Sequence, residues 1–82
     1  MPHMTDADQP QFLALLGELE TFFREALTVQ QREQYWRLCQ DRATLPEWAY
    51  AAREAMVHEG YYHVPLIAHL MDYVREYRKE VA

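Results

Sequence analysis

Apolar residues recur at intervals of three and four along most of the chain, in four stretches separated by short polar breaks. Residues at this spacing share one face of an α-helix, so each stretch predicts an amphipathic helix. The four predicted helices cover residues of about 10–27, 29–41, 45–59 and 65–80. The predicted fold is therefore all-α, a compact bundle of four short helices joined by connections of a few residues.

The first predicted helix has the longest apolar stripe. Pro10 suits its first turn, because a backbone N–H at that position would have no partner within the helix. Glu18, Arg24 and Glu25 are expected on the opposite side, facing solvent. The stripe consists of Phe12, Leu15, Leu16, Leu19, Phe22, Phe23, Ala26 and Leu27.

The breaks carry helix start and stop signals. Thr28 with Gln31, and Thr44 with Glu47, have the spacing of a capping box, in which the two side chains satisfy two backbone N–H groups at a helix start. Gly60 is expected to end the third helix, because glycine adopts the left-handed conformation without a steric penalty.

The other three helices have shorter apolar faces, and Pro65 is expected to open the last of them. We expect these faces to consist of Tyr35, Trp36, Leu38 and Cys39; of Leu45, Trp48, Ala49, Ala52, Ala55 and Met56; and of Leu66, Ile67, Leu70, Met71, Val74, Tyr77 and Val81.

A chain of 82 residues is long enough for one domain. Residues 1–9 are expected to be a cloning remnant followed by a flexible N-terminus, with Met4 as the natural first residue and His3 outside any functional site. Residues 10–82 then form the single helical domain. No apolar run approaches the length of about 20 residues that spans a membrane, and no secretory signal precedes the first helix.

The net charge of −5, from thirteen acidic and eight basic residues, bears on the class of partner. Nucleic acids and anionic membranes attract positively charged surfaces, so this balance argues against both. Cys39 is the only cysteine, which excludes an intramolecular disulfide and favours a cytoplasmic location.

Few residues have the spacing that catalysis or metal binding requires. His58 and His63 are five residues apart with Gly60 between them, so they cannot share one helix face, even with Glu59 or His69 nearby. Cys39 lies on an apolar stripe and is expected to be buried rather than nucleophilic. We therefore expect no metal, no cofactor and no enzymatic activity.

Two surfaces could bind a macromolecule. Large side chains fall on or beside the polar faces of the last two helices, and tyrosine is enriched at protein interfaces. The alternative is a nucleic-acid-binding surface on which arginines flank aromatic rings. The candidate partner-binding residues are Tyr50, Tyr61, Tyr62, His69 and Tyr73, and the alternative nucleic-acid-binding residues are Arg32, Arg37, Arg42 and Arg53.

The stretch from Tyr35 to Arg75 resembles the N-terminal helical domain of phage replicative-helicase loader/inhibitor proteins. The similarity lies in a helix with aromatic residues and a leucine, a helix with repeated alanines, and a proline before the final helix. The residues that carry it are Tyr35, Trp36 and Leu38, then Ala49, Ala52 and Ala55, then Val64-Pro65-Leu66-Ile67-Ala68-His69-Leu70.

The resemblance implies a phage or mobile-element protein that acts on a replicative helicase through protein–protein contact. The helicase-contacting segment of that family lies in a flexible C-terminal region, whereas this chain ends at Ala82, directly after its last predicted helix. No functional residue can therefore be transferred from the family. The sequence predicts a non-enzymatic adaptor or inhibitor, with a small nucleic-acid-binding domain or a homodimeric regulator as the alternatives.

Overall fold

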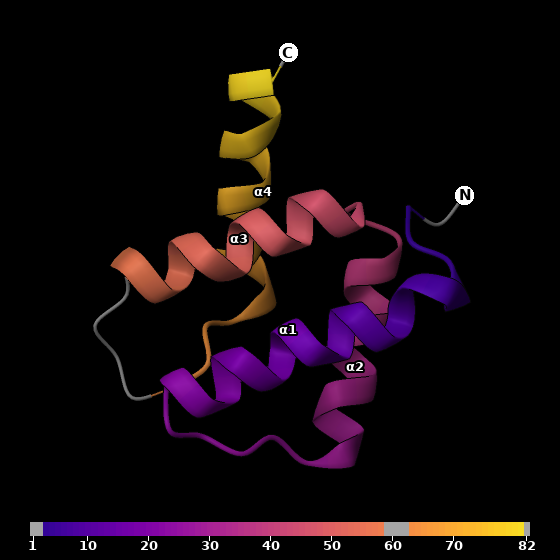
Figure 1. Cartoon of the computed structure of the whole chain (residues 1–82), viewed down its shortest axis with the longest axis vertical. Coiled ribbons are helices and arrows are strands. Elements are labelled where there is room, and N and C mark those ends of the chain that lie inside the picture. Colours follow the sequence, from indigo (N-terminus) through magenta and orange to yellow (C-terminus); the bar gives the residue numbers. More distant parts are fainter. Residues whose placement is uncertain (1–2, 59–62, 82) are drawn as a thin grey trace.

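The computed structural model describes residues 3–58 and 63–81, and these form an all-α fold, as the sequence predicted. A short 3₁₀ turn, Asp6–Asp8, precedes α1 (Gln9–Phe22), α2 (Val29–Gln40), α3 (Leu45–His58) and α4 (Ile67–Val81). Figure 1 shows α1 and α3 side by side, with α4 crossing α3 steeply. α3 packs against both α1 and α4 and so lies at the centre of the bundle. None of the helices in the described part of the chain is long and apolar enough to cross a membrane.

The core is built around Trp48, which is fully buried in the middle of the bundle. Its ring stacks on Phe12 of α1 with centroids 4.4 Å apart, and its Nε1–H donates to the Phe12 carbonyl oxygen at 3.3 Å. Trp36 of α2 contacts the same phenylalanine at 5.2 Å. Three helices therefore meet at one aromatic cluster, which stabilises their arrangement.

The predicted apolar stripes are largely buried, but some of their members face solvent. Phe22, Leu38, Leu66 and Val81 are exposed, Leu66 to 75%. Each lies at the edge of its stripe or at a helix end, where the neighbouring helix does not reach. Ala51, which the stripes omitted, is fully buried.

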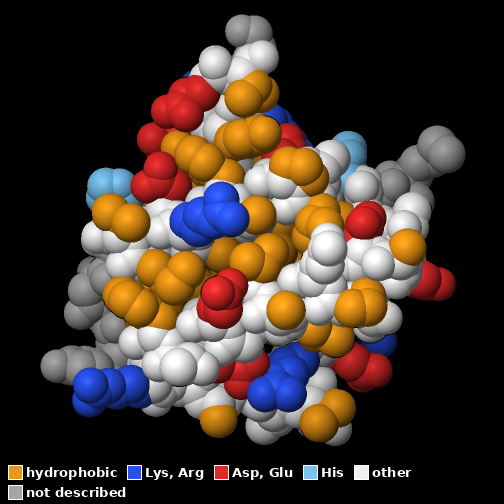
Figure 2. Space-filling view, viewed as in Figure 1, with side chains coloured by type: hydrophobic (Ala, Val, Ile, Leu, Met, Phe, Trp, Pro, Cys, Tyr) orange, Lys and Arg blue, Asp and Glu red, His pale blue; other side chains and the backbone are white. Residues whose placement is uncertain are grey.

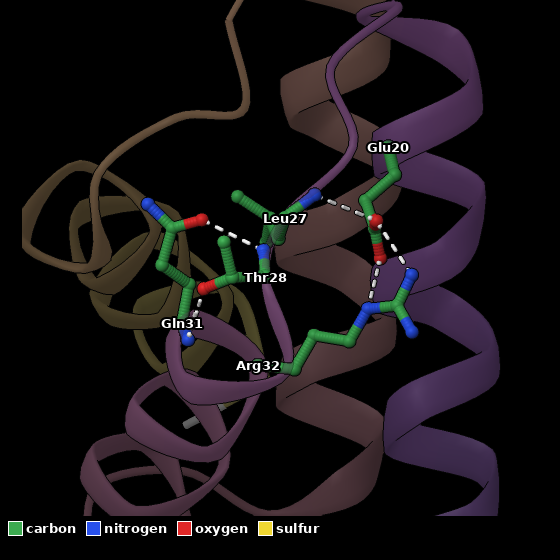
Figure 3. Close-up of polar contacts among 5 residues, drawn as sticks. All are labelled: Glu20, Leu27, Thr28, Gln31 and Arg32. Atoms are coloured by element: carbon green, nitrogen blue, oxygen red, sulfur yellow. Dashed lines mark hydrogen bonds and ion pairs between the residues drawn. The ribbon is translucent and has the colours of Figure 1, made fainter.

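Both predicted capping boxes are confirmed. At the start of α2, the Gln31 N–H donates to Thr28 Oγ1 at 3.0 Å, and the Thr28 N–H donates to Gln31 Oε1 at 2.8 Å (Figure 3). At the start of α3, the Thr44 N–H donates to Glu47 Oε1 at 2.8 Å and the Glu47 N–H to Thr44 Oγ1 at 3.4 Å. These boxes need only residues three apart, which is why the sequence reveals them.

The first helix ends at Phe22, five residues earlier than predicted. Arg24 has a φ angle of 56°, in the left-handed region, and reverses the chain direction. The Glu25 N–H then donates to the Glu20 carbonyl at 3.0 Å and the Arg24 N–H to the Thr21 carbonyl at 3.3 Å, which together form a Schellman motif. Glycine usually occupies this position, so arginine gave no signal of a helix end.

Replacing Arg24 with glycine is expected to stabilise the protein by about 1 kcal/mol, because an L-residue with a side chain is strained in the left-handed conformation. The midpoint of thermal unfolding should rise by about 4–8 °C for a domain of this size. Circular dichroism during heating measures this shift. Thr21→Gly, in the regular part of the same helix, is the matched control and should lower the midpoint; a lowered midpoint for Arg24→Gly would contradict the assignment.

Residues 3–8, the described part of the N-terminal segment, differ from the flexible lead expected for residues 1–9. Met4 is fully buried, and the backbone N–H groups of His3 and Met4 donate to the Gln40 carbonyl at 2.8 and 3.1 Å. The Thr5 N–H donates to Asp8 Oδ2 at 3.0 Å and closes the 3₁₀ turn. Residues 3–8 are therefore folded against the C-terminal end of α2.

The last helix begins at Ile67, two residues after the proline that was expected to open it. The Pro65 carbonyl accepts a hydrogen bond from the Tyr35 hydroxyl at 2.8 Å, and the Val64 N–H donates to Glu25 Oε1 at 2.8 Å. These contacts hold residues 64 and 65 outside the helix. Gly60, the expected end of the third helix, lies outside the described residues.

Among the residues that the structure describes, three glutamates each join a backbone N–H to a basic side chain, and we call them the bridging glutamates: Glu20, Glu25 and Glu47. Glu20 accepts from the Leu27 N–H at 2.9 Å and from Arg32 at 3.0 and 2.8 Å (Figure 3). Charge-assisted hydrogen bonds of this kind are stronger than neutral ones. Glu20 is nearly buried, although the sequence pattern did not place it on the apolar stripe of its helix.

The other two bridging glutamates act in the same way. Glu25 accepts from the Val64 N–H and lies 3.0 Å from His63 Nδ1, which joins the α1–α2 connection to the segment before α4. Glu47 accepts from Arg78 of α4 at 2.6 and 3.1 Å in addition to its capping contact. Together these contacts fix α4 against the rest of the bundle.

Candidate protein-binding surface

Polar and aromatic side chains line the contact between α3 and α4. The side chains contributed by α3 lie four residues apart, and three of those contributed by α4 have the same spacing. Each set therefore occupies one face of its helix. We call the combined set the aromatic–acidic strip. It consists of Tyr50, Glu54 and His58 of α3, and His69, Tyr73, Tyr77 and Glu80 of α4.

One end of the strip is a tyrosine pair. The rings of Tyr50 and Tyr77 are 5.1 Å apart and tilted by 48°, a favourable geometry for aromatic rings. The Tyr50 hydroxyl lies 3.5 Å from Glu80 Oε2. Both tyrosines are half-buried, so part of each side chain remains accessible to solvent.

The other end of the strip is built around Tyr73. Its ring is nearly parallel to that of His58, with centroids 6.4 Å apart, and meets the ring of His69 edge-on at 6.0 Å. His58 Nε2 lies 3.0 Å from Glu54 Oε2. Glu54 also interacts with Tyr50 and thereby links the two ends into one continuous surface.

The electrostatic character of the strip is negative. Desolvation of the ring and the nearby carboxylates of Glu54, Glu80 and Glu76 raise the pKa of Tyr50 to about 12. Tyr50 therefore remains a neutral hydrogen-bond donor at physiological pH. A surface that combines carboxylates with tyrosine faces suits the side chains of lysine and arginine.

The structure brings three of the five predicted partner-binding residues, Tyr50, His69 and Tyr73, into this strip. Tyr61 and Tyr62 lie outside the described residues. The strip also contains residues that the sequence pattern did not indicate. Tyr77 was assigned to the apolar stripe of its helix, although its position four residues after Tyr73 already placed both rings on one face.

The alternative nucleic-acid-binding arginines are distributed over several elements. Arg32 pairs with Glu20 of α1, Arg42 Nη1 donates to the Leu38 carbonyl at 2.8 Å, and Arg53 lines a groove between α1 and α3. Arg37 is exposed on α2. The structure therefore does not gather Arg32, Arg42 and Arg53 at one place.

The side chains considered for metal binding or nucleophilic chemistry have other contacts. His58 pairs with Glu54 and His63 with Glu25, each at 3.0 Å. Within residues 3–58 and 63–81, no three histidine, cysteine, aspartate or glutamate side chains lie close enough to hold a metal ion. Cys39 is fully buried, as predicted, and burial raises the pKa of its thiol to about 12.

Comparisons with known proteins do not assign this chain to a family. No family model matches the chain, and no curated protein or solved structure shows significant similarity to it. The similarity to helicase loader/inhibitor proteins thus rests on the residues between Tyr35 and Arg75 and stays a prediction.

Proposed function

We propose that this protein is a non-enzymatic interaction module and that its aromatic–acidic strip binds a basic segment of a partner protein. One observation carries the proposal: tyrosine rings and carboxylates form a continuous surface across α3 and α4, from Glu80 through Tyr50 and Glu54 to Tyr73. Interfaces are enriched in such aromatic residues, and a few of them contribute most of the binding free energy.

The physical basis of binding is the match between this strip and positively charged side chains. Arginine or lysine of the partner would pair with the carboxylates and lie over the tyrosine faces. The net charge of −5 attracts a basic partner over longer distances and speeds association. Because the side chains project from packed helices, little conformational entropy is lost on binding.

The family resemblance supplies the first partner to test, a replicative helicase of a phage or its host in the cytoplasm. In this proposal the protein acts as an adaptor or inhibitor by occupying a basic surface of the helicase. Affinity capture from the native host, followed by mass spectrometry, would identify a different partner if the helicase does not bind.

Binding to the purified partner tests the strip directly. Tyr73→Ala is expected to raise the dissociation constant roughly tenfold or more, as for a central interface tyrosine. Glu54→Gln should raise the dissociation constant less. It should also make binding depend less on the salt concentration, since one charge pair is lost. Calorimetric titration at two salt concentrations measures both effects.

Val29→Ala is the control, because Val29 is 73% exposed on α2, outside the strip. It should leave binding unchanged. If Tyr73→Ala binds as tightly as the original protein, the strip is not the binding surface. If the protein instead binds DNA with an affinity that falls steeply with salt, the nucleic-acid alternative is correct.

A further inference from the structure

A second surface lies between α2 and α4, whereas the aromatic–acidic strip lies over the contact between α3 and α4. A hollow of about 560 Å³ opens between α2 and α4. Its lining residues on α4 follow one another at intervals of three and four, so they share one face of that helix. We call it the arginine hollow, and its main lining residues are Leu38, Arg42, Ile67, Met71, Arg75 and Arg78.

The floor of the arginine hollow is apolar. Leu38 remains 41% exposed, although the apolar period of its helix predicted burial. Ile67 is half-buried and Met71 lies one turn further along α4. Binding sites typically combine such apolar surface with a few polar groups at fixed positions. The floor is therefore suited to a leucine, isoleucine or phenylalanine side chain of another molecule.

The rim of the hollow carries three of the eight basic residues of the chain, although the net charge is −5. The side chains of Arg75 and Arg78 are 64% and 46% exposed. Asp41 lines the hollow as well. Figure 2 shows a different pattern on the face that it views, where basic side chains stand apart from one another and acidic ones gather beside the C-terminal end of α4. Three guanidinium groups around one hollow are thus a local feature of this surface.

The contacts of the three arginines leave hydrogen-bond donors available. Arg42 donates to a backbone carbonyl at 2.8 Å and, within the described part of the chain, forms no ion pair. Arg75 pairs with Asp72 through Nη1, and Arg78 pairs with Glu47 through Nε and Nη2. A guanidinium group has five N–H donors, so each of these arginines keeps N–H groups for a further acceptor. A carboxylate accepts such N–H groups in pairs.

The combination of floor and rim indicates the chemistry of the ligand. The net negative charge of the protein repels an acidic segment elsewhere on the surface, whereas the hollow offers it guanidinium donors. Nucleic acids also carry anionic acceptors, but their bases stack on aromatic rings. None of the described side chains that line the hollow is aromatic. A protein segment that combines carboxylates with large apolar side chains matches both the rim and the floor.

We infer that the arginine hollow binds an acidic segment of a second partner protein, with an apolar side chain on the floor and carboxylates on the arginines. This site goes beyond the proposed function, because the aromatic–acidic strip binds a basic segment and uses other residues. The strip lies on the α3 side of α4 and the hollow on its α2 side. An adaptor with both sites could therefore hold two proteins of opposite charge together.

Peptide selection on the full chain tests this inference. A library of random peptides of about 12 residues, displayed on phage, is first depleted of peptides that bind Arg42→Gln and is then bound to the original protein. The selected peptides are expected to combine aspartate or glutamate with leucine, isoleucine or phenylalanine. Their dissociation constants should lie in the range of about 10–100 µM, as for a small interface. Fluorescence anisotropy of a labelled selected peptide measures this constant.

Two further variants test the rim and the floor separately. Arg75→Gln and Leu38→Gln should each raise the dissociation constant of the peptide about fivefold or more, because one removes a charge and the other an apolar contact. Both change exposed side chains, so far-UV circular dichroism should show the original helices. Arg37→Gln removes an exposed arginine of α2 outside the hollow and is the matched control for Arg75→Gln. It should change the dissociation constant by less than about twofold.

The opposite results would overturn the inference. These are selected peptides without acidic residues, or acidic peptides whose affinity neither Arg75→Gln nor Leu38→Gln changes. Binding of a single-stranded oligonucleotide that Arg75→Gln abolishes, in place of peptide binding, would assign the hollow to phosphate groups instead. Tyr73→Ala should bind the acidic peptide like the original protein, and Leu38→Gln should bind the basic partner like the original protein. The strip and the hollow are therefore tested independently.

Discussion

Replacing Trp48 with alanine is expected to remove about 4 kcal/mol of stability, the typical cost of emptying the site of a large buried aromatic side chain. Trp48 is fully buried, stacks on Phe12 and donates its Nε1–H to the Phe12 carbonyl. A domain of this size has a total stability of about 4–12 kcal/mol. The variant should therefore retain about 0–8 kcal/mol, and its midpoint of thermal unfolding should fall by roughly 16–32 °C, at about 4–8 °C per kcal/mol.

Far-UV circular dichroism during heating and urea titration measures this loss. Trp48→Phe is the graded control, because it keeps an aromatic ring on Phe12 but loses the Nε1 hydrogen bond, and it should lose about 1–2 kcal/mol. Val57→Ala, exposed on the same helix, should change stability by less than about 0.5 kcal/mol. A Trp48→Ala variant that unfolds within a few degrees of the original protein would show that the aromatic cluster is not the centre of the core.

Replacing Glu47 with glutamine is expected to reduce stability by about 2 kcal/mol at neutral pH, since the carboxylate makes charge-assisted hydrogen bonds while nearly buried. Hydrogen bonding to the Arg78 side chain holds the pKa of Glu47 below its ordinary value of 4.5, against the opposing effect of burial. Arg32 has the same effect on the pKa of Glu20.

The dependence on pH follows from these lowered pKa values. In the unfolded chain each carboxyl binds a proton near pH 4.5, whereas the folded protein binds that proton only at lower pH. The stability that the pairs contribute is therefore fully present above about pH 4.5 and is lost as the pH falls through the folded pKa. Urea titrations between pH 7 and pH 2.5 should show stability falling below pH 4.5, and the difference between the original protein and Glu47→Gln should shrink towards pH 2.5.

Glu33→Gln removes an exposed carboxylate from α2 and is the matched control for Glu47→Gln. It should change stability by less than about 0.5 kcal/mol. If Glu47→Gln and Glu33→Gln have equal effects at neutral pH, the Glu47–Arg78 pair does not stabilise the fold.

Local features of this fold could be read from the sequence, whereas long-range polar contacts could not. The capping boxes at Thr28 and Thr44 depend on residues three apart, and both have the predicted contacts. The partners of the bridging glutamates lie between seven and 39 residues away, apart from the capping contact of Glu47. No local pattern marks such pairs, because their choice depends on how the helices pack.

The misplaced end of the first helix has a different cause. The apolar period continues through Phe23, Ala26 and Leu27 although the helix stops at Phe22, so the period alone extends it too far. The left-handed conformation at Arg24 has no signal in the sequence, because glycine usually occupies this position of a Schellman motif. The same applies to the binding surface: tyrosines were recognisable by type, but only the packing of α3 on α4 shows that Tyr50 and Tyr77 meet.

The bridging glutamates change what amide hydrogen exchange reports in this protein. The N–H group of Val64 lies outside the helices, where exchange with solvent is normally fast, yet it donates to the carboxylate of Glu25, 39 residues earlier in the chain. Its exchange therefore requires separation of the α1–α2 connection from the segment before α4, not the fraying of a helix end. In this protein, an amide in a connecting segment thus reports on the contact between two distant parts of the chain.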